Sequence, residues 1–162
     1  MILLVRDPRG VFNSRMQEPF AKLCRFSPRC WKLEVACARL TEDLKAAKSL
    51  SVKFPGSITV LRYEDLSLHP EKIPSLVMDF LEMPWTESMT KFMASHTSQE
   101  EFLLGRNKNM IKNEIFLFST QVKNSLDTSE TALAWRKQMS PEKVREVEKA
   151  CEKPFLVGPT YI

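Results

Sequence analysis

The chain begins Met1-Ile-Leu-Leu-Val-Arg-Asp-Pro-Arg-Gly-Val-Phe-Asn-Ser-Arg15, a segment that combines a short apolar run, a turn signal and a helix start. The continuous apolar run at residues 2–5 suits a strand buried on both faces of a parallel sheet. Asp7 can cap a helix with its carboxylate, and Pro8 suits the first helical position because its φ is already helical. The segment therefore predicts a strand, a tight turn and a helix in succession.

The junction between this strand and helix is a candidate anion site. In open α/β sheets ligands bind outside the carboxyl ends of the strands, where a helix N-terminus offers free N–H groups. Gly10 and Ser14 are four residues apart and so share one helix face, on which an anion can approach the backbone at Gly10. We expect Arg6, Ser14 and Arg15 to hold a phosphate through charge-assisted hydrogen bonds of about 1.5–3 kcal/mol each. The alternative is a capped helix start whose charges are solvated.

A second strand follows after a long helix. The helix is predicted by apolar residues that recur at steps of four and three, namely Leu33, Cys37, Leu40, Leu44 and Ala47. Phe54-Pro55-Gly56 then makes a turn, and residues 57–63 are rich in β-branched residues, as strands are. A strand, a long helix and a second strand predict a parallel crossover unit.

Three later positions are weaker candidates for binding. Tyr63 ends the second strand, where its ring could lie against a base or be a half-buried strand-end side chain. Thr97 or Ser98 is placed to cap a helix that begins at residues 99–101. Arg136 lies in a helical segment, where it is either a contact to an anion or an exposed arginine. We also expect an irregular segment over residues 105–131.

The last predicted helix begins at Ser140 and Pro141, which cap and start it. Its buried face carries Val144, Val147 and Cys151.

Composition excludes several classes of protein. A chain of 162 residues with 43% hydrophobic and 27% charged residues is ordinary for one globular domain. The apolar runs are too short for a membrane span or a signal peptide. The net charge of +4 suits a polyanionic partner, but the cations are dispersed and lack interleaved aromatic residues, so no nucleic acid is expected.

Because Met1 opens a buried strand directly, we expect the chain to be the interior of a larger domain.

The four cysteines, Cys24, Cys30, Cys37 and Cys151, allow three pairings if all are oxidised. None forms a C-x-x-C pair, and no metal site is predicted. Cys37 and Cys151 fall on apolar helical faces, where a free cysteine is a small core residue.

The stretch Arg6-Asp-Pro-Arg-Gly-Val-Phe-Asn-Ser-Arg15 closely resembles the 3′-phosphate-binding motif of sulfotransferases that use 3′-phosphoadenosine 5′-phosphosulfate (PAPS), in particular the Golgi carbohydrate sulfotransferases. The resemblance implies that Arg6 and Ser14 hold the 3′-phosphate. Tyr-Glu-Asp-Leu at residues 63–66 is similar to a family segment whose tyrosine contacts the adenine, which implies that role for Tyr63.

Two further segments carry the resemblance. His-Thr-Ser at residues 96–98 is similar to a segment of cytosolic sulfotransferases, which implies an adenine contact for Thr97, although Gln99 stands where that family has an aromatic residue. Thr-Ala-Leu-Ala-Trp-Arg at residues 131–136 resembles a segment near the end of carbohydrate sulfotransferases, which implies that Arg136 contacts a phosphate or an acidic glycan.

The resemblance covers essentially the whole chain and implies an α/β, P-loop-like sulfotransferase fold with a parallel sheet flanked by helices. Residues 1–162 would form a single partial domain that lacks the N-terminal strand, loop and helix of the family. That loop holds the 5′-phosphosulfate, and transfer depends on its positioning and electrostatics. No catalytic residue is therefore assigned.

The implied function is transfer of sulfate from PAPS, without a metal, to a hydroxyl of a glycan acceptor. The implied location is the lumenal side of the Golgi membrane, with any membrane anchor outside this chain. For a protein of the secretory pathway we expect a disulfide of Cys24 with Cys30 or Cys37. The alternative is a non-catalytic protein that retains a nucleotide half-site or acts as an interaction module. The acceptor sugar and the oligomeric state stay open.

Overall fold

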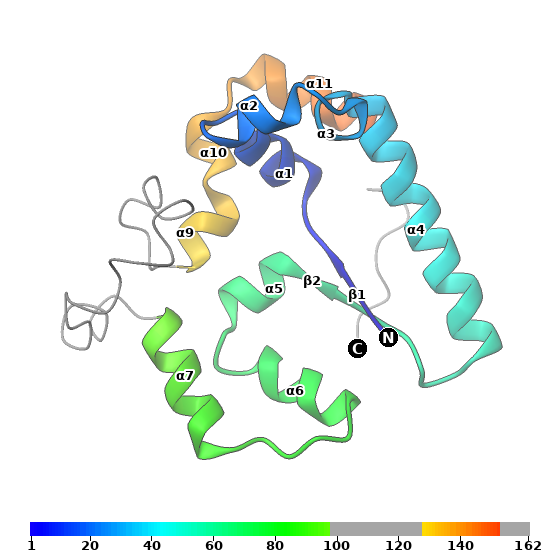
Figure 1. Ribbon diagram of the computed structural model, residues 1–162, viewed down its shortest axis with the longest axis vertical. Coiled ribbons are helices and arrows are strands. Elements are labelled where there is room, and N and C mark those ends of the chain that lie inside the picture. Colours follow the sequence, from blue (N-terminus) through cyan, green and yellow to red (C-terminus); the bar gives the residue numbers. More distant parts are fainter. Residues whose placement is uncertain (98–127, 153–162) are drawn as a thin grey trace. The chain divides into compact units, whose positions relative to one another are not determined.

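The structure is a computed structural model that describes residues 1–97 and 128–152, with only the backbone described for residues 95–97 (Figure 1). The elements in these ranges are β1 (Ile2–Val5), α1 (Pro8–Arg15), α2 (Phe20–Cys24), α3 (Pro28–Trp31), α4 (Leu33–Lys53), β2 (Thr59–Arg62), α5 (Tyr63–Leu68), α6 (Ile73–Phe80), α7 (Glu87–Thr97), α9 (Thr128–Leu133), α10 (Trp135–Gln138) and α11 (Pro141–Ala150). They divide into two compact units, one containing residues 1–63 and those from Leu133 onward, the other residues 64–132. The prediction of a single partial domain over residues 1–162 stays a prediction.

The sheet of the first unit confirms the predicted parallel crossover. β1 pairs with β2 in parallel, with Ile2 opposite Thr59 and Val5 opposite Arg62, and the long helix α4 joins them (Figure 1). Gly56, in the turn before β2, has a φ of 76°, a left-handed conformation that glycine adopts without strain. The prediction that β1 is buried on both faces is wrong, since Leu4 is 56% exposed. The described sheet has two strands, β1 and β2.

The local signals at the helix starts act as predicted. The Asp7 carboxylate caps α1 by accepting from the Arg9 backbone N–H at 2.8 Å, and Pro8 is the first helical residue. Ser140 caps α11 in the same way, accepting from the Lys143 backbone N–H at 3.3 Å. Both helices therefore begin where their capping residues place them.

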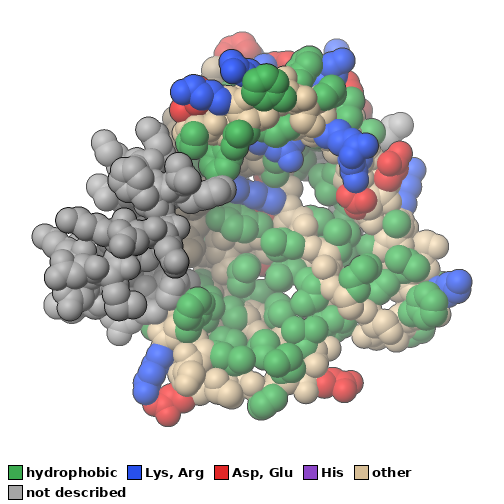
Figure 2. Space-filling model, in the orientation of Figure 1, with side chains coloured by type: hydrophobic (Ala, Val, Ile, Leu, Met, Phe, Trp, Pro, Cys, Tyr) green, Lys and Arg blue, Asp and Glu red, His purple; other side chains and the backbone are tan. Residues whose placement is uncertain are grey.

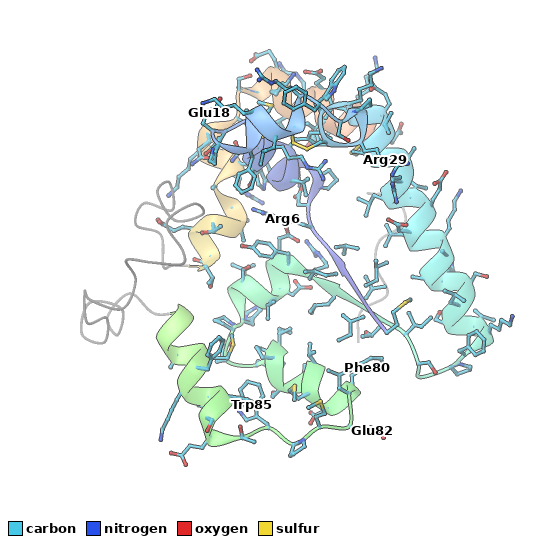
Figure 3. All side chains as sticks on the ribbon, in the orientation of Figure 1. Arg6, Glu18, Arg29, Phe80, Glu82 and Trp85 are labelled. Carbon is cyan, nitrogen blue, oxygen red and sulfur yellow. A yellow bond between two sulfur atoms is a disulfide. The ribbon has the colours of Figure 1, made fainter. Side chains whose placement is uncertain are left out.

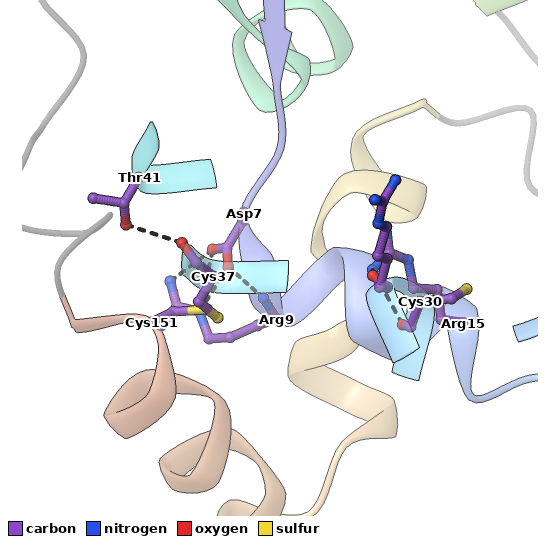
Figure 4. Close-up of a disulfide and its surroundings, with 8 residues drawn as sticks. Asp7, Arg9, Arg15, Cys30, Cys37, Thr41 and Cys151 are labelled. Carbon is purple, nitrogen blue, oxygen red and sulfur yellow. Dashed lines mark hydrogen bonds and ion pairs between the residues drawn. A yellow bond between two sulfur atoms is a disulfide. The ribbon is translucent and has the colours of Figure 1, made fainter. Parts of the chain in front are cut away.

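The core of the first unit lies where α1, α4 and α11 meet, and it consists of Phe12, Leu33, Cys37, Val147 and Cys151. Cys37 and Cys151 form a disulfide between α4 and the end of α11, which rules out the alternative that they are free core cysteines (Figure 4). The two cysteines lie 114 residues apart in sequence, and only the packing of α11 against α4 brings them together. A second disulfide joins Cys24 to Cys30, one of the two pairings that the family resemblance implied.

The second unit contains α6, α7 and most of α5 and α9. Trp85, between α6 and α7, donates from its indole nitrogen to the Thr90 hydroxyl at 2.8 Å (Figure 3). Thr128 Oγ1 donates to the Ser67 carbonyl oxygen at 2.7 Å, which ties the start of α9 to α5. Leu81, Met83 and Phe92 are exposed in this unit, and apolar side chains are prominent on its visible face in Figure 2.

Two boundaries in this unit differ from the sequence prediction. The chain is still helical up to Thr97, because the apolar pattern of Met89, Phe92 and Met93 continues into α7 without a helix breaker. Thr97 is therefore helical where the sequence predicted the cap of a new helix, and Ser98 and Gln99 lie outside the described residues. The irregular segment predicted for residues 105–131 also lies outside them, except that residues 128–131 are already helical.

Candidate functional site

The carboxyl ends of the two parallel strands bring Arg6 and Tyr63 together. Arg6 follows β1 directly and Tyr63 follows β2, so both emerge at the same edge of the sheet. The guanidinium carbon of Arg6 lies 4.3 Å from the centre of the Tyr63 ring, a cation–π contact. Figure 3 shows Arg6 at the junction between β1 and α1. Two of the residues proposed from sequence are therefore neighbours in the fold.

Gly10 allows close packing against α1 beside Arg6. A Cβ atom at Gly10 would lie 3.2 Å from Arg6 Nε and 3.5 Å from Trp135 Cδ1, tighter than ordinary packing in the first case. Ser14 lies four residues further along the same helix, is partly buried, and its hydroxyl has no hydrogen-bond partner within the described ranges. The face of α1 that carries Gly10 and Ser14 thus combines a close approach to the backbone, a guanidinium and an available hydroxyl.

Arg9 does not contribute to this face, because it is held by two carboxylates. It contacts the Asp7 carboxylate through Nε and Nη2, at 2.7 Å for the shortest pair, and donates from Nη1 to Glu148 at 2.7 Å. Its guanidinium also lies 4.1 Å from the Trp135 ring centre. The hydrogen bonds to Asp7 raise the pKa of Arg9, although burial opposes them. Arg9 therefore fastens the start of α1 to α10 and α11.

Arg15 points to a different side of α1. Its Nη1 donates to the carbonyl oxygens of Arg29 at 3.5 Å and Cys30 at 3.2 Å, in α3 (Figure 4). Burial lowers the pKa of Arg15. These contacts order the helix pair α1–α3, and they leave Arg15 lining a cavity that Ser14 does not line.

That cavity has a volume of about 420 Å³ and lies between β1, α1 and α4. Its apolar lining includes Phe12, Ala36, Leu40 and the Cys37–Cys151 disulfide. Among the described residues, its charged lining is four arginines and one acid, namely Arg6, Arg15, Arg29, Arg39 and Asp43. Such a charge balance favours an anionic ligand. In Figure 2, basic side chains are visible over the part of the first unit formed by α2 to α4, and Figure 3 labels Arg29 near the start of α4.

The remaining two predicted residues, Arg136 and Thr97, belong to the helices α10 and α7. Arg136 is exposed in α10, with its guanidinium carbon 5.2 Å from the Trp135 ring centre. Thr97 belongs to the other compact unit, and its side chain lies outside the described part of the structure. The binding roles of Arg6, Ser14, Arg15, Tyr63, Thr97 and Arg136 stay predictions.

Sequence reasoning missed Trp135, which is only 7% exposed and lies at the centre of this region. Arg9 and Arg136 both lie against its ring, and its edge meets α1 at Gly10. The available signal was its position one residue before Arg136 in a segment already singled out. Its burial could not be predicted locally, because it depends on how α10 packs on α1.

The described residues contain neither a metal site nor a membrane-spanning helix. Within residues 1–97 and 128–152, no group of three or more His, Cys, Asp or Glu side chains is arranged to hold a metal ion. None of the helices in these ranges combines the length and hydrophobicity needed to cross a bilayer.

With this geometry the chain belongs to the sulfotransferase family, since the family model described as "Sulfotransferase domain" matches residues 1–156. Among curated proteins it is 29% identical over 169 residues to carbohydrate sulfotransferase 1 of Mus musculus, covering 94% of this chain and 36% of the relative. It is 28% identical to carbohydrate sulfotransferase 1 of Homo sapiens, with the same coverage of each chain. Carbohydrate sulfotransferase 2 of Mus musculus is 26% identical over 125 residues, covering 77% of this chain and 21% of the relative.

The chain therefore spans about a third of the length of the first two relatives. No solved structure gives a significant match. The family resemblance drawn from residues 6–15 is confirmed by these comparisons.

Proposed function

We propose that this chain is the part of a carbohydrate sulfotransferase that binds the 3′-phosphate end of PAPS, the sulfate donor. Its fold would be the α/β, P-loop-like fold of that family, with residues 1–162 forming one partial domain. The family match, the parallel pair β1 and β2, and the helix that starts at their carboxyl edge support this proposal.

One observation carries the proposal most directly. At the carboxyl end of β1, the guanidinium of Arg6 lies against the start of α1 at Gly10, where a helix N-terminus favours negative charge. In the proposed complex Arg6 and Ser14 hold the 3′-phosphate, and Tyr63 contacts the adenine. Arg15, Thr97 and Arg136 supply further contacts to the nucleotide or to an acidic acceptor.

The proposed reaction moves a sulfuryl group from PAPS to a hydroxyl of a carbohydrate. The sulfur–oxygen bond to the 5′-phosphate breaks, a bond from sulfur to the sugar oxygen forms, and the hydroxyl proton leaves to a base. The products are 3′,5′-bisphosphoadenosine and the sulfated glycan. We assign no catalytic residue in this chain, because none of its segments reads as the glycine- and serine-rich loop that holds the phosphosulfate.

A location on the lumenal side of the Golgi membrane follows from the same family. The disulfides Cys24–Cys30 and Cys37–Cys151 support it, since disulfides persist in oxidising compartments such as those of the secretory pathway. Membrane attachment would come from an anchor outside the residues of this chain.

Isothermal titration calorimetry with 3′,5′-bisphosphoadenosine and adenosine 5′-monophosphate tests the assignment of Arg6. We expect the unaltered chain to prefer the bisphosphate by about tenfold or more, because one charge-assisted hydrogen bond is worth about 1.5–3 kcal/mol. Arg6→Ala should remove that preference. Arg25→Ala, which deletes an exposed cation 4.7 Å from the Phe26 ring, should leave it unchanged. A preference that survives in Arg6→Ala would refute the assignment.

A transfer assay separates the enzyme from the non-catalytic alternative. The chain is mixed with ³⁵S-labelled PAPS and a panel of unsulfated and partly sulfated glycans. Incorporation of label into a glycan supports catalysis by this chain. Binding of the bisphosphate nucleotide without any incorporation supports a nucleotide half-site that has no activity by itself.

A further inference from the structure

The indole N–H of Trp135 is buried without a hydrogen bond. The side chain is 7% exposed, and its Nε1 is fully buried with no acceptor within hydrogen-bond distance. An indole nitrogen can only donate a hydrogen bond, so only an acceptor can satisfy it. Buried donors without partners are rare in folded proteins, because they lose their bond to water and gain none. This donor therefore calls for an acceptor that the described residues do not supply.

The position of Trp135 indicates where such an acceptor would lie. Trp135 Cδ1, the atom bonded to Nε1, lies 3.5 Å from the position that a Cβ would take at Gly10. Arg6 Nε and Nη2 lie 3.2 and 3.6 Å from the same point. Gly10, which has no side chain, is therefore the point at which the Trp135 edge and the Arg6 guanidinium meet the start of α1.

A second donor at this point also lacks an acceptor. In the first turn of α1, Pro8 has no N–H, the Arg9 N–H donates to Asp7 Oδ1, and the Val11 N–H donates to the Asp7 carbonyl oxygen. Gly10 is a buried residue, and no hydrogen bond from its N–H to any residue that the structure describes is found. Two buried donors thus lie beside one cation at the positive end of a helix.

The surroundings favour a small anion over a neutral acceptor. The Asp7 carboxylate, which is near in sequence, is already occupied by Arg9. Among the described residues, the guanidinium groups of Arg9 and Arg136 lie 4.1 Å and 5.2 Å from the centre of the Trp135 ring. The atoms of Arg6 nearest to Gly10 belong to the end of a flexible side chain, so a movement of that guanidinium, which also lies 4.3 Å from the Tyr63 ring centre, would open the site.

We propose that the indole N–H of Trp135 and the backbone N–H of Gly10 donate to the same phosphate that Arg6 binds, which makes Trp135 a nucleotide-binding residue. Naming this phosphate as the 3′-phosphate of the donor nucleotide rests on the proposed function. The presence of an anion site at Gly10 rests on the donors alone.

NMR spectroscopy of the ¹⁵N-labelled chain tests the proposal directly. The chain has three tryptophans, Trp31, Trp85 and Trp135, and so gives three indole N–H signals, which the three Trp→Phe variants assign. Separate titrations use 3′,5′-bisphosphoadenosine, adenosine 5′-monophosphate and inorganic phosphate. The Trp135 indole proton should move downfield with the bisphosphate, while the Trp31 and Trp85 signals stay in place.

Affinity measurements on Trp135→Phe supply the second readout. Phenylalanine keeps an aromatic ring for Arg9 and removes the donor, so the bisphosphate should bind about tenfold or more weakly while the affinity for the 5′-monophosphate is unchanged. Trp31→Phe is the matched control, because Trp31 is 51% exposed in α3. A similar loss for both nucleotides would indicate disturbed packing and overturn the proposal.

The outcomes distinguish this inference from the proposed function. If the bisphosphate binds through Arg6 but the Trp135 signal does not move, the inference is wrong and the proposed function stands. If inorganic phosphate moves the Trp135 signal while the bisphosphate is not preferred to the monophosphate, the anion site stands and the nucleotide assignment is wrong. If no anion moves the signal, the inference is wrong whatever binds elsewhere.

Discussion

Removing the disulfide between Cys37 and Cys151 should destabilise the first compact unit strongly. The bridge closes a loop of 114 residues, and its cysteines are 2% and 0% exposed. In the chain-entropy model a loop of that length corresponds to about 5 kcal/mol at 25 °C. The Cys24–Cys30 bridge closes a loop of 6 residues, for which the same expression gives about 2 kcal/mol. The chain therefore carries its own matched control.

Urea denaturation of two double variants, Cys37→Ala with Cys151→Ala and Cys24→Ala with Cys30→Ala, measures the difference. We expect the free energy of unfolding to fall by about 4–5 kcal/mol for the long bridge and by about 2 kcal/mol for the short one. Because whole domains have only about 5–15 kcal/mol of stability, the first variant should be close to unfolded without denaturant. Equal losses, or a larger loss for the short bridge, would refute the reasoning from loop length and core position.

Three further predictions concern single residues. Arg9→Ala should lower the free energy of unfolding by about 2–3 kcal/mol in thermal or urea melts, because it removes charge-assisted bonds to Asp7 and Glu148 and the contact with Trp135. The bond to Glu148 contributes little of this, since that carboxylate is 43% exposed. A loss under 0.5 kcal/mol would contradict the prediction. Gly10→Ala should leave the melting temperature unchanged or raise it, because alanine suits a helix better by up to about 1 kcal/mol. Calorimetry should nevertheless show weaker binding of the bisphosphate nucleotide, because the new Cβ would lie 3.2 Å from Arg6 Nε and displace it. Unchanged affinity would contradict this prediction. The backbone N–H of Glu142 and the Ser140 hydroxyl lower the pKa of Glu142 from its ordinary 4.5, so the ionised carboxylate stabilises the fold above that pH and the effect is lost as the pH falls below it. In Glu142→Gln the melting temperature should therefore depend less on pH over that acid range. An unaltered pH dependence would count against the cap.

The parts of the fold that depend on neighbouring residues were predictable from sequence. Asp7 and Pro8 start α1, and Ser140 and Pro141 start α11, because a cap is a contact over two or three residues. The spacing of Leu33, Cys37, Leu44 and Ala47 placed the buried side of α4 correctly. The apolar run at residues 2–5 and the segment rich in β-branched residues at 57–63, joined by a long helix, indicated the parallel pair of strands.

The parts that depend on long-range packing were not predictable. Pairing Cys37 with Cys151 requires α11 to lie on α4, and each cysteine by itself resembles a core residue. Glu148, the second carboxylate that holds Arg9, lies 139 residues away in sequence, so this contact could not be predicted from neighbouring residues. Leu4 belongs to an apolar run but is exposed, because burial depends on what covers the sheet. For the site, Arg6 with Tyr63 followed from strand ends, whereas the burial of Trp135 followed from the placement of α10.

The measurement that tests the central claim most directly is the affinity of the chain for 3′,5′-bisphosphoadenosine compared with its 2′,5′ isomer. The two nucleotides carry the same charge and base and differ only in the position of one phosphate. A site in which Arg6 and the start of α1 hold a 3′-phosphate beside Tyr63 should prefer the 3′,5′ isomer by about tenfold or more. Equal affinities for the two isomers would show that the arginines attract anions without recognising the nucleotide, and would contradict the account.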